Sequence, residues 1–297
     1  MYRPRKYKRA ARDNEADIQA QFETLVSVQP AAAGSPLIFA SPHSGDAYPA
    51  LWLEQCKATK AQLRSVEDIW VDDLFEVAPA CGAAFVQAHF PRSYLDVNRS
   101  ADERPDYLLA QGAEMSARVA AGLGVLPTAI APDCLIYDRP PSAKAVQMRI
   151  DACHTPYHAA LRDCIDSAIN RHGRAILIDC HSMPGFGPMR ARRPDFILGD
   201  RHGKSCAPDL IDAVQDFLTA KDYSVTRNHP YAGGYTTAHY GAPDAGVHAL
   251  QIEINRDLYV HPASLTRKPG YADLKRDLSE LTAFLAAGYS QQSLAAE

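Results

Sequence analysis

Three features that this sequence lacks limit what it can encode. No apolar run approaches the roughly 20 residues that a helix needs to cross a bilayer. The seven cysteines are odd in number and have no regular spacing, so they predict reduced thiols rather than a disulfide framework. The formal net charge is only −4 at pH 7, which does not favour a nucleic-acid-binding protein. We therefore expect a cytoplasmic protein that has neither a membrane nor a nucleic acid as its partner.

The N-terminal segment is basic and reads MYRPRKYKRAAR. It lacks the apolar centre of a signal peptide. We interpret residues 1–20 as a flexible tail that is solvated or contacts another protomer; a nucleic-acid-binding arm is the alternative. The sequence leaves the oligomeric state open.

Strand-like and helix-like patterns alternate along the rest of the chain. Its 297 residues are 46% hydrophobic and contain no internal repeat or clear linker. The alternation predicts a single three-layer α/β domain over residues 21–297. Short apolar runs predict strands at 37–40, 84–88, 94–97, 176–178, 196–200, 223–227 and 247–256.

Apolar residues at helical spacing predict helices at 59–80, 143–171, 208–218 and 264–287. We expect Pro156 to interrupt the second of these and Ser205 to cap the third. Residues 100–142 look irregular, with a shorter helix near 114–121. So long a loop usually covers a site or an interface.

Polar side chains gather where the predicted strands end. His43 and Asp46 follow the strand at 37–40, and His181 follows the apolar run at 176–178. Ligands of open α/β sheets bind beyond the carboxyl ends of the strands, so we expect these side chains to meet. Two histidines and a carboxylate form the ligand set of a catalytic zinc ion. The sequence therefore predicts a Zn²⁺ site at His43, Asp46 and His181, which iron, cobalt or manganese could also occupy.

Two further strand ends carry groups suited to amide hydrolysis. Glu253 could take a proton from water and deliver it to the leaving amine. Arg99, with Asn98 beside it, offers a planar pair of donors for a substrate carboxylate. Two of the candidate residues also have a structural interpretation. Asp46 could cap a turn, and Arg99 could pair with a nearby aspartate. The small-molecule substrate that we expect is an acidic amide.

Two other histidines, His154 and His158, are four residues apart on the predicted helix at 143–171. This spacing could chelate a metal. We interpret them as packing or surface residues because no carboxylate partner is obvious. Asp200 ends another predicted strand.

Four motifs together resemble the N-formylglutamate amidohydrolases. They are SPHSG at 41–45, RSYLDVNR at 92–99, DCHS at 179–182 and EINR at 253–256, and the resemblance extends over about residues 37–260. It implies a zinc-dependent hydrolase with a mixed, mostly parallel sheet flanked by helices, similar in plan to the zinc carboxypeptidases. The type reaction of the family splits N-formyl-L-glutamate into formate and L-glutamate in histidine breakdown.

The resemblance also implies roles for individual residues. It adds Arg92 to Asn98 and Arg99 as a substrate-binding residue. An acid in the region of Asp68 recurs in the family, so Asp68 is the alternative third ligand. We favour Asp46 for its tight spacing after the first histidine.

Some assignments stay open between a functional and a structural interpretation. Tyr235 and Tyr231 could close over the substrate or pack within their loop. Arg190, Arg192 and Arg193 could bind a second substrate carboxylate or lie on the surface. Two other functions are open as well. The same residues could hydrolyse another small amide or the C-terminus of a short peptide, or the fold could bind a small acidic ligand without catalysis.

Overall fold

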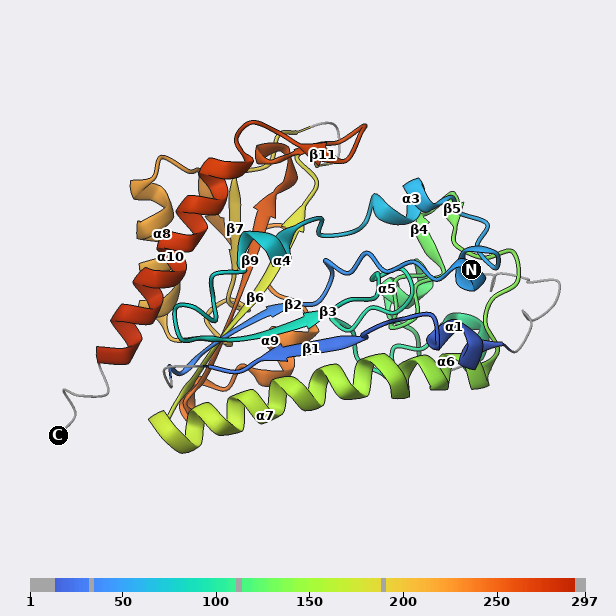
Figure 1. The fold of residues 1–297 in the computed structure, drawn as a ribbon, viewed down its shortest axis with the longest axis horizontal. Helices are drawn as coiled ribbons and strands as arrows, with labels where there is room; N and C mark the ends of the chain where they lie inside the picture. The colour runs from blue at the N-terminus through green and yellow to red at the C-terminus, as the bar shows by residue number, and fades with distance from the viewer. Residues whose placement is uncertain (1–13, 32–34, 111–113, 188–190, 292–297) are drawn as a thin grey trace. The chain divides into compact units, whose positions relative to one another are not determined.

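The structure is a computed structural model that describes residues 14–31, 35–110, 114–187 and 191–291 (Figure 1). Residue contacts divide the chain into two units. Unit 1 comprises residues 1–27, 42–67 and 88–159, and unit 2 comprises residues 28–41, 68–87 and 160–297. The predicted boundary between a tail at 1–20 and a domain at 21–297 stays a prediction, and residues 1–13 lie outside the described part.

Seven strands form the central sheet, in the order β1-β3-β2-β6-β9-β7-β8. Neighbours from β3 to β9 run parallel, β7 runs antiparallel to β9, and β8 is parallel to β7. The strands are β1 (Val26–Gln29), β2 (Leu37–Ser41), β3 (Ala84–Ala88), β6 (Ala175–Met183), β7 (Phe196–Gly199), β8 (Val225–Arg227) and β9 (Val247–Asn255). This mixed, mostly parallel sheet with flanking helices confirms the predicted α/β class.

One face of the sheet in unit 2 packs against α4 (Val71–Leu74), α8 (Pro208–Ala220) and α10 (Tyr271–Gln291). On β6, Ile176, Ile178 and Cys180 belong to this apolar core. Because side chains alternate along a strand, Asp179 and His181 lie on the opposite face. On that side, α9 (Tyr235–Tyr240) contacts β9. The alternation of side chains along β6 thus separates the apolar core from the polar residues.

Unit 1 contains short helices and one small hairpin. The helices are α1 (Glu15–Gln19), α2 (Ala50–Leu53), α3 (Lys60–Arg64), α5 (Ala117–Ala120) and α6 (Ala143–Arg149), and the hairpin pairs β4 (Ala129–Ala131) with β5 (Cys134–Leu135). The predicted strand at 94–97 is wrong. The Asp96 side chain accepts a hydrogen bond from the Asn98 N–H, which turns the chain there.

The single helix predicted over 59–80 is also wrong. Thr59 forms a capping box at the start of α3, but α3 ends at Arg64 and α4 begins only at Val71. Trp70 has a φ of 58°, in the left-handed region, which stops helical propagation between them. Asp68 therefore lies in a break between two helices.

The second predicted helix forms with the expected interruption. A π-helical turn at Ile150–His154 separates α6 from α7 (Thr155–His172). Pro156 has no N–H to donate to the preceding turn, which accounts for the irregularity.

Two helix starts differ from the prediction. Ala207 is the N-cap of α8, with Pro208 at its first turn, while the Ser205 hydroxyl donates to the Ala249 carbonyl, 2.8 Å away. The last helix starts at Tyr271 because the hairpin of β10 (Val260–His261) and β11 (Thr266–Arg267) precedes it. Three 3₁₀ turns complete the described structure, η1 (Asp106–Leu108), η4 (Pro243–Ala245) and η5 (Arg256–Leu258).

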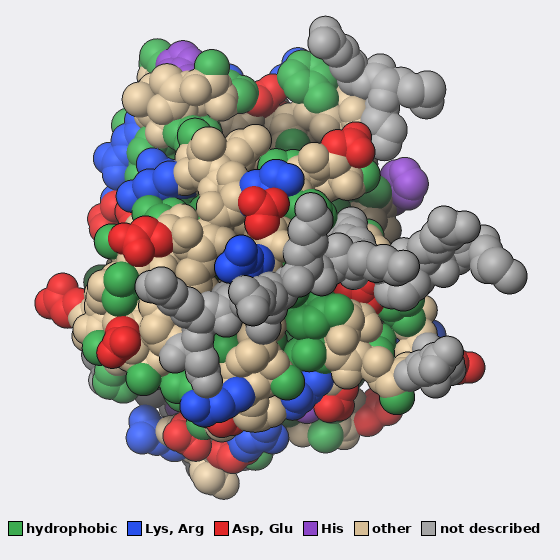
Figure 2. Space-filling view, turned by 90° about the vertical axis from the view of Figure 1, so that its right-hand side faces the viewer, with side chains coloured by type: hydrophobic (Ala, Val, Ile, Leu, Met, Phe, Trp, Pro, Cys, Tyr) green, Lys and Arg blue, Asp and Glu red, His purple; other side chains and the backbone are tan. Residues whose placement is uncertain are grey.

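Two surface properties bear on possible partners. Within the described ranges, none of the helices combines the length and apolar character that spanning a membrane requires. On the face drawn in Figure 2, basic and acidic side chains are interspersed rather than segregated. This distribution agrees with the small net charge of −4.

Candidate active site

The register between β6 and β9 brings the predicted base beside a predicted metal ligand. His181 is the Cα partner of Glu253 in this parallel pair. Glu253 is 8% exposed, and its Oε1 accepts a hydrogen bond of 2.8 Å from the Gln251 amide. Gln251 Oε1 in turn accepts from the Gly234 N–H at 2.7 Å. The carboxylate is therefore buried and held in one orientation next to the histidine.

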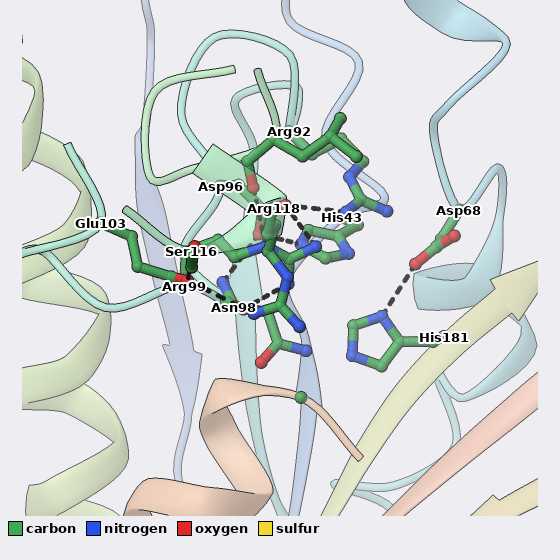
Figure 3. A network of polar contacts seen from close by, with 12 residues as sticks. His43, Asp68, Arg92, Asp96, Asn98, Arg99, Glu103, Ser116, Arg118 and His181 are labelled. Atoms are coloured by element: carbon green, nitrogen blue, oxygen red, sulfur yellow. Dashed lines mark hydrogen bonds and ion pairs between the residues drawn. The ribbon is translucent and has the colours of Figure 1, made fainter. Parts of the chain in front are cut away.

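Carboxylates flank both ring nitrogens of His181. Nδ1 is 2.9 Å from Asp68 Oδ2, as Figure 3 shows, and Nε2 is 3.0 Å from Asp179 Oδ2. The Ser182 hydroxyl donates to Asp68 Oδ1 at 3.0 Å. Burial alone would lower the pKa of His181, but the two carboxylates outweigh it and hold that pKa well above its usual value. This environment is strongly attractive to a positive charge.

The second buried histidine, His43, belongs to a separate network in unit 1 (Figure 3). Its Nε2 is 2.7 Å from Asp96 Oδ1. Asp96 also accepts from Arg92 Nη2 at 2.7 Å and from the Asn98 N–H at 2.9 Å, and Arg99 Nη2 lies 3.7 Å away. Burial would raise the pKa of Asp96, but the charges of Arg99, His43 and Arg92 hold it well below its usual range.

Three of these residues form a group that could hold a metal ion. One ligand atom from each of His43, Asp68 and His181 lies within 4.8 Å of the others, and all three side chains are buried. His43 follows the last residue of β2 by two positions, and β2 pairs with β6, the strand that carries His181. Two imidazoles and one carboxylate match the donor set of a catalytic zinc site. Asp46 is exposed and is not in the group.

The predicted substrate-binding arginines are both held by their surroundings. Arg99 donates from Nε to the Leu123 carbonyl at 3.1 Å and from Nη1 to the Asn98 carbonyl at 2.6 Å. Its proximity to Asp96 agrees with the structural pairing considered for it. The Arg92 side chain is the more exposed of the two, at 24% against 15%. Asn98, which lies between these two arginines in the sequence, is buried.

The helical histidines contact backbone carbonyls. His154 Nε2 is 2.9 Å from the Arg99 carbonyl, and His158 Nε2 is 2.8 Å from the Val97 carbonyl. These contacts fit their interpretation as packing residues, and they brace the loop that carries the arginine. Asp200 accepts from the Asn228 amide at 2.7 Å and so belongs to a turn.

The tyrosines and arginines for which a role in substrate binding was considered have different contacts. The Arg193 guanidinium lies 5.2 Å from the Tyr231 ring centroid. Tyr235 stacks on His239, with ring centroids 4.9 Å apart. The Arg192 side chain is 78% exposed, and Arg190 lies outside the described residues.

The sequence argument gave no role beside the metal ligands to three polar residues: Asp96, Asp179 and Ser182. Their contacts join positions up to 114 residues apart, so spacing along the chain could not reveal them. One signal was available for Asp179, because residues two apart on a strand share a face. Asn255, near the last strand end, instead donates to the Arg193 and Pro194 carbonyls.

Comparison with known proteins adds independent information. The family model of N-formylglutamate amidohydrolase matches residues 35–260. N-formylglutamate deformylases of Pseudomonas aeruginosa and Pseudomonas putida are each 30% identical, over 236 and 234 residues, or 76% of this chain and 82% of theirs. The family model and the names of these relatives define an amide-bond hydrolase.

Two solved structures share the fold of this chain. The crystal structure of N-formylglutamate amidohydrolase from Ralstonia eutropha JMP134 superposes with a TM-score of 0.83 at 35% identity, covering 90% of this chain and 99% of that one. The gene product Atu2144 of Agrobacterium tumefaciens shares the fold, with a TM-score of 0.67 at 18% identity over 91% of this chain and 97% of that one. The chain belongs to the N-formylglutamate amidohydrolase family.

Proposed function

We propose that this protein hydrolyses N-formyl-L-glutamate to formate and L-glutamate. The observation that carries the proposal is a buried His43-Asp68-His181 group with Glu253 paired beside it on the neighbouring strand. Relatives with 30% identity are named for this reaction, which supports the choice of substrate. We place the reaction in histidine breakdown, as the family resemblance implies, and in the cytoplasm, as the odd number of irregularly spaced cysteines favours.

The proposed ligands of a Zn²⁺ or similar divalent ion are His43, Asp68 and His181. Asp68 replaces Asp46 in this proposal because Asp68 is buried with the histidines. When bound, the ion supplies Lewis-acid polarisation of the amide carbonyl and makes water more acidic. The buried carboxylates around His181 favour such a cation electrostatically.

Glu253 is the proposed general base and acid. Its carboxylate accepts a proton from the attacking water, whose oxygen forms the new bond to the formyl carbon. The C–N bond breaks, and the same proton passes to the leaving nitrogen of glutamate. Gln251 holds Oε1 during these steps, because its own amide is anchored by the Gly234 N–H.

The loop from Arg92 to Arg99 is the proposed anchor for a substrate carboxylate. Guanidinium groups bind carboxylates through paired, charge-assisted hydrogen bonds. Asp96 contacts both arginines and thereby restricts their positions. Asn98 and Tyr235 are the further residues that we assign to substrate binding.

The test measures formate release by zinc-loaded protein from N-formyl-L-glutamate and from N-formyl-L-glutamine, which lacks the side-chain charge. We expect a preference for the glutamate compound. Glu253→Gln should lower kcat by about 10²- to 10⁴-fold and keep its zinc. Glu76→Gln is the matched control, since that glutamate pairs with Lys275 and its side chain is 60% exposed.

Two results would contradict the proposal. The first is the absence of hydrolysis of any N-acyl amino acid by zinc-loaded protein. The second is binding of acidic ligands without turnover that Glu253→Gln leaves unchanged, which would favour the non-catalytic binder. Hydrolysis of other amides without a dicarboxylate preference would favour the alternative substrate class.

A further inference from the structure

Each of the three proposed metal ligands has a buried partner on one of its polar atoms. Asp96 lies 2.7 Å from Nε2 of His43. Asp179 lies 3.0 Å from Nε2 of His181. The three partners, Asp96, Asp179 and Ser182, are at most 6% exposed. The two histidines therefore share one arrangement although they lie 138 positions apart in the chain (181 − 43).

The arrangement determines which nitrogen can bind a metal. A neutral imidazole carries one N–H and one lone pair, and an ionised carboxylate can only accept. A carboxylate beside Nε2 therefore keeps the proton on Nε2 and leaves the lone pair on Nδ1. In His181, Nδ1 is also the atom that lies 2.9 Å from Asp68, another member of the group. Asp96 thus favours the His43 tautomer that has its lone pair on Nδ1. In His181 carboxylates face both nitrogens, and Nδ1 would be the ligand atom because Asp68, on that side of the ring, is itself a member of the group.

The third ligand is oriented in a similar way. Ser182 donates its hydroxyl hydrogen to Asp68 Oδ1 at 3.0 Å, while Oδ2 is the oxygen near the histidine. Ser182 and His181 are adjacent on β6 and lie on opposite faces of the strand. The strand therefore contacts both oxygens of the same aspartate.

We propose that Asp96, Asp179 and Ser182 are positioning residues that set the ligand atoms of the metal site. Nδ1 of both histidines and Oδ2 of Asp68 would then be the atoms that hold the ion. Outer partners of this kind contribute about 10- to 100-fold to metal affinity. The inference rests on the proposed metal site and extends it to residues that contact neither substrate nor metal.

Asp96 and Asp179 differ in their other contacts. Asp96 also accepts from Arg92 and from the Asn98 N–H, so it connects a ligand histidine to the proposed carboxylate anchor. Asp179 is fully buried on β6. Replacing Asp96 should therefore change both zinc affinity and KM, whereas replacing Asp179 should change zinc affinity alone once the enzyme is fully loaded.

The experiment measures zinc affinity by competition with a chromophoric chelator for the wild type and each variant. Asp179→Ala should weaken zinc binding by about 10- to 100-fold. Asp179→Asn should weaken it less, because the amide oxygen still accepts the Nε2–H bond without the charge. Asp200→Asn is the matched control, since Asp200 is a buried strand-end carboxylate held by Asn228. The visible spectrum of the cobalt(II)-loaded proteins provides a second readout, which should change in the Asp179 variants and not in the control.

Each result decides between supporting and overturning the proposal. If the wild type binds zinc and the Asp96 and Asp179 variants bind it equally well, the positioning roles are wrong and the proposed function stands. If the wild type takes up neither zinc nor cobalt, both proposals fail. If Asp179→Ala does not fold, Ser182→Ala tests the same claim, because it removes only the hydroxyl that holds Asp68.

Discussion

Glu15 and Arg149 form a buried ion pair within unit 1, and breaking it should strongly destabilise the protein. Arg149 donates from Nε and Nη2 to the two carboxylate oxygens of Glu15, each at 2.9 Å. Its third nitrogen, Nη1, donates to the Tyr137 hydroxyl at 2.9 Å, and its guanidinium lies 4.1 Å from the Tyr94 ring centroid. The arginine is fully buried, and the glutamate is 2% exposed. Glu15→Gln would therefore leave a guanidinium charge without its counterion away from water.

The size of the effect follows from this burial. Removing one member of a buried ion pair costs about 3–5 kcal/mol, because the other charge stays desolvated. For a chain of this size each kcal/mol corresponds to about 2 °C in Tm, so Glu15→Gln should lower Tm by about 6–10 °C. The exposed Asp17 on the same helix is the matched control, and Asp17→Asn should change stability by less than about 0.5 kcal/mol.

Urea titration and calorimetry of four proteins test this reasoning: the wild type, Glu15→Gln, Arg149→Met and the double variant. The double variant should be less destabilised than the sum of the two single variants, since it leaves no unpaired buried charge. A loss below about 1 kcal/mol for Glu15→Gln would refute the argument, as would additivity of the two single effects to within about 0.5 kcal/mol.

Three further predictions follow from the same structure. Asp68→Asn should abolish stoichiometric zinc in elemental analysis and Asp46→Asn should not, because only Asp68 is buried with the histidines; the opposite pattern would restore Asp46 as the ligand. Burial raises the pKa of Cys56 to about 12, so only about one thiol in 10⁴ is ionised at pH 8. Iodoacetamide should therefore label Cys56 slowly, at a rate that rises as the pH increases. Rapid labelling at pH 8, measured by mass spectrometry, would contradict this. Asp96, whose pKa lies below its unfolded value, should contribute stability above about pH 4 that is lost as the pH falls. In acid titrations of stability, Asp96→Asn should therefore show a smaller loss than the wild type. An equal loss in both proteins would show that the carboxylate contributes nothing.

Short apolar runs bounded by turn residues predicted six of the seven strands of the central sheet and missed β1. The register of these strands could not be predicted, because it depends on contacts between strands that are distant in sequence. The pairing of His181 with Glu253 is such a contact, and it is the main reason for grouping the two residues. The sequence indicated only that both lie near strand ends.

The break between α3 and α4 shows why spacing along the chain could not decide between Asp46 and Asp68 as the third ligand. Leu63, Ile69 and Leu74 are all buried, so the apolar spacing continues across a segment that is not one helix. The left-handed backbone at Trp70 has no glycine or proline to signal it. Asp68 lies in this break, where it contacts His181, and local sequence shows neither the break nor the contact.

Glu15 illustrates a limit of composition. We expected residues 1–20 to form a tail because the segment begins with a run of basic residues. Glu15 is nevertheless buried, since its partner Arg149 lies 134 positions later in the chain. A charged residue looks solvated in sequence unless its partner is known.

The central claim is that His43, Asp68 and His181 hold a catalytic metal ion. Elemental analysis of the wild type and His181→Ala, purified in parallel and then offered zinc, tests it most directly. We predict about one zinc per chain in the wild type and its loss in the variant, since three protein ligands are needed for a catalytic zinc site. Absence of metal from both proteins, with none taken up on adding zinc, would contradict the account.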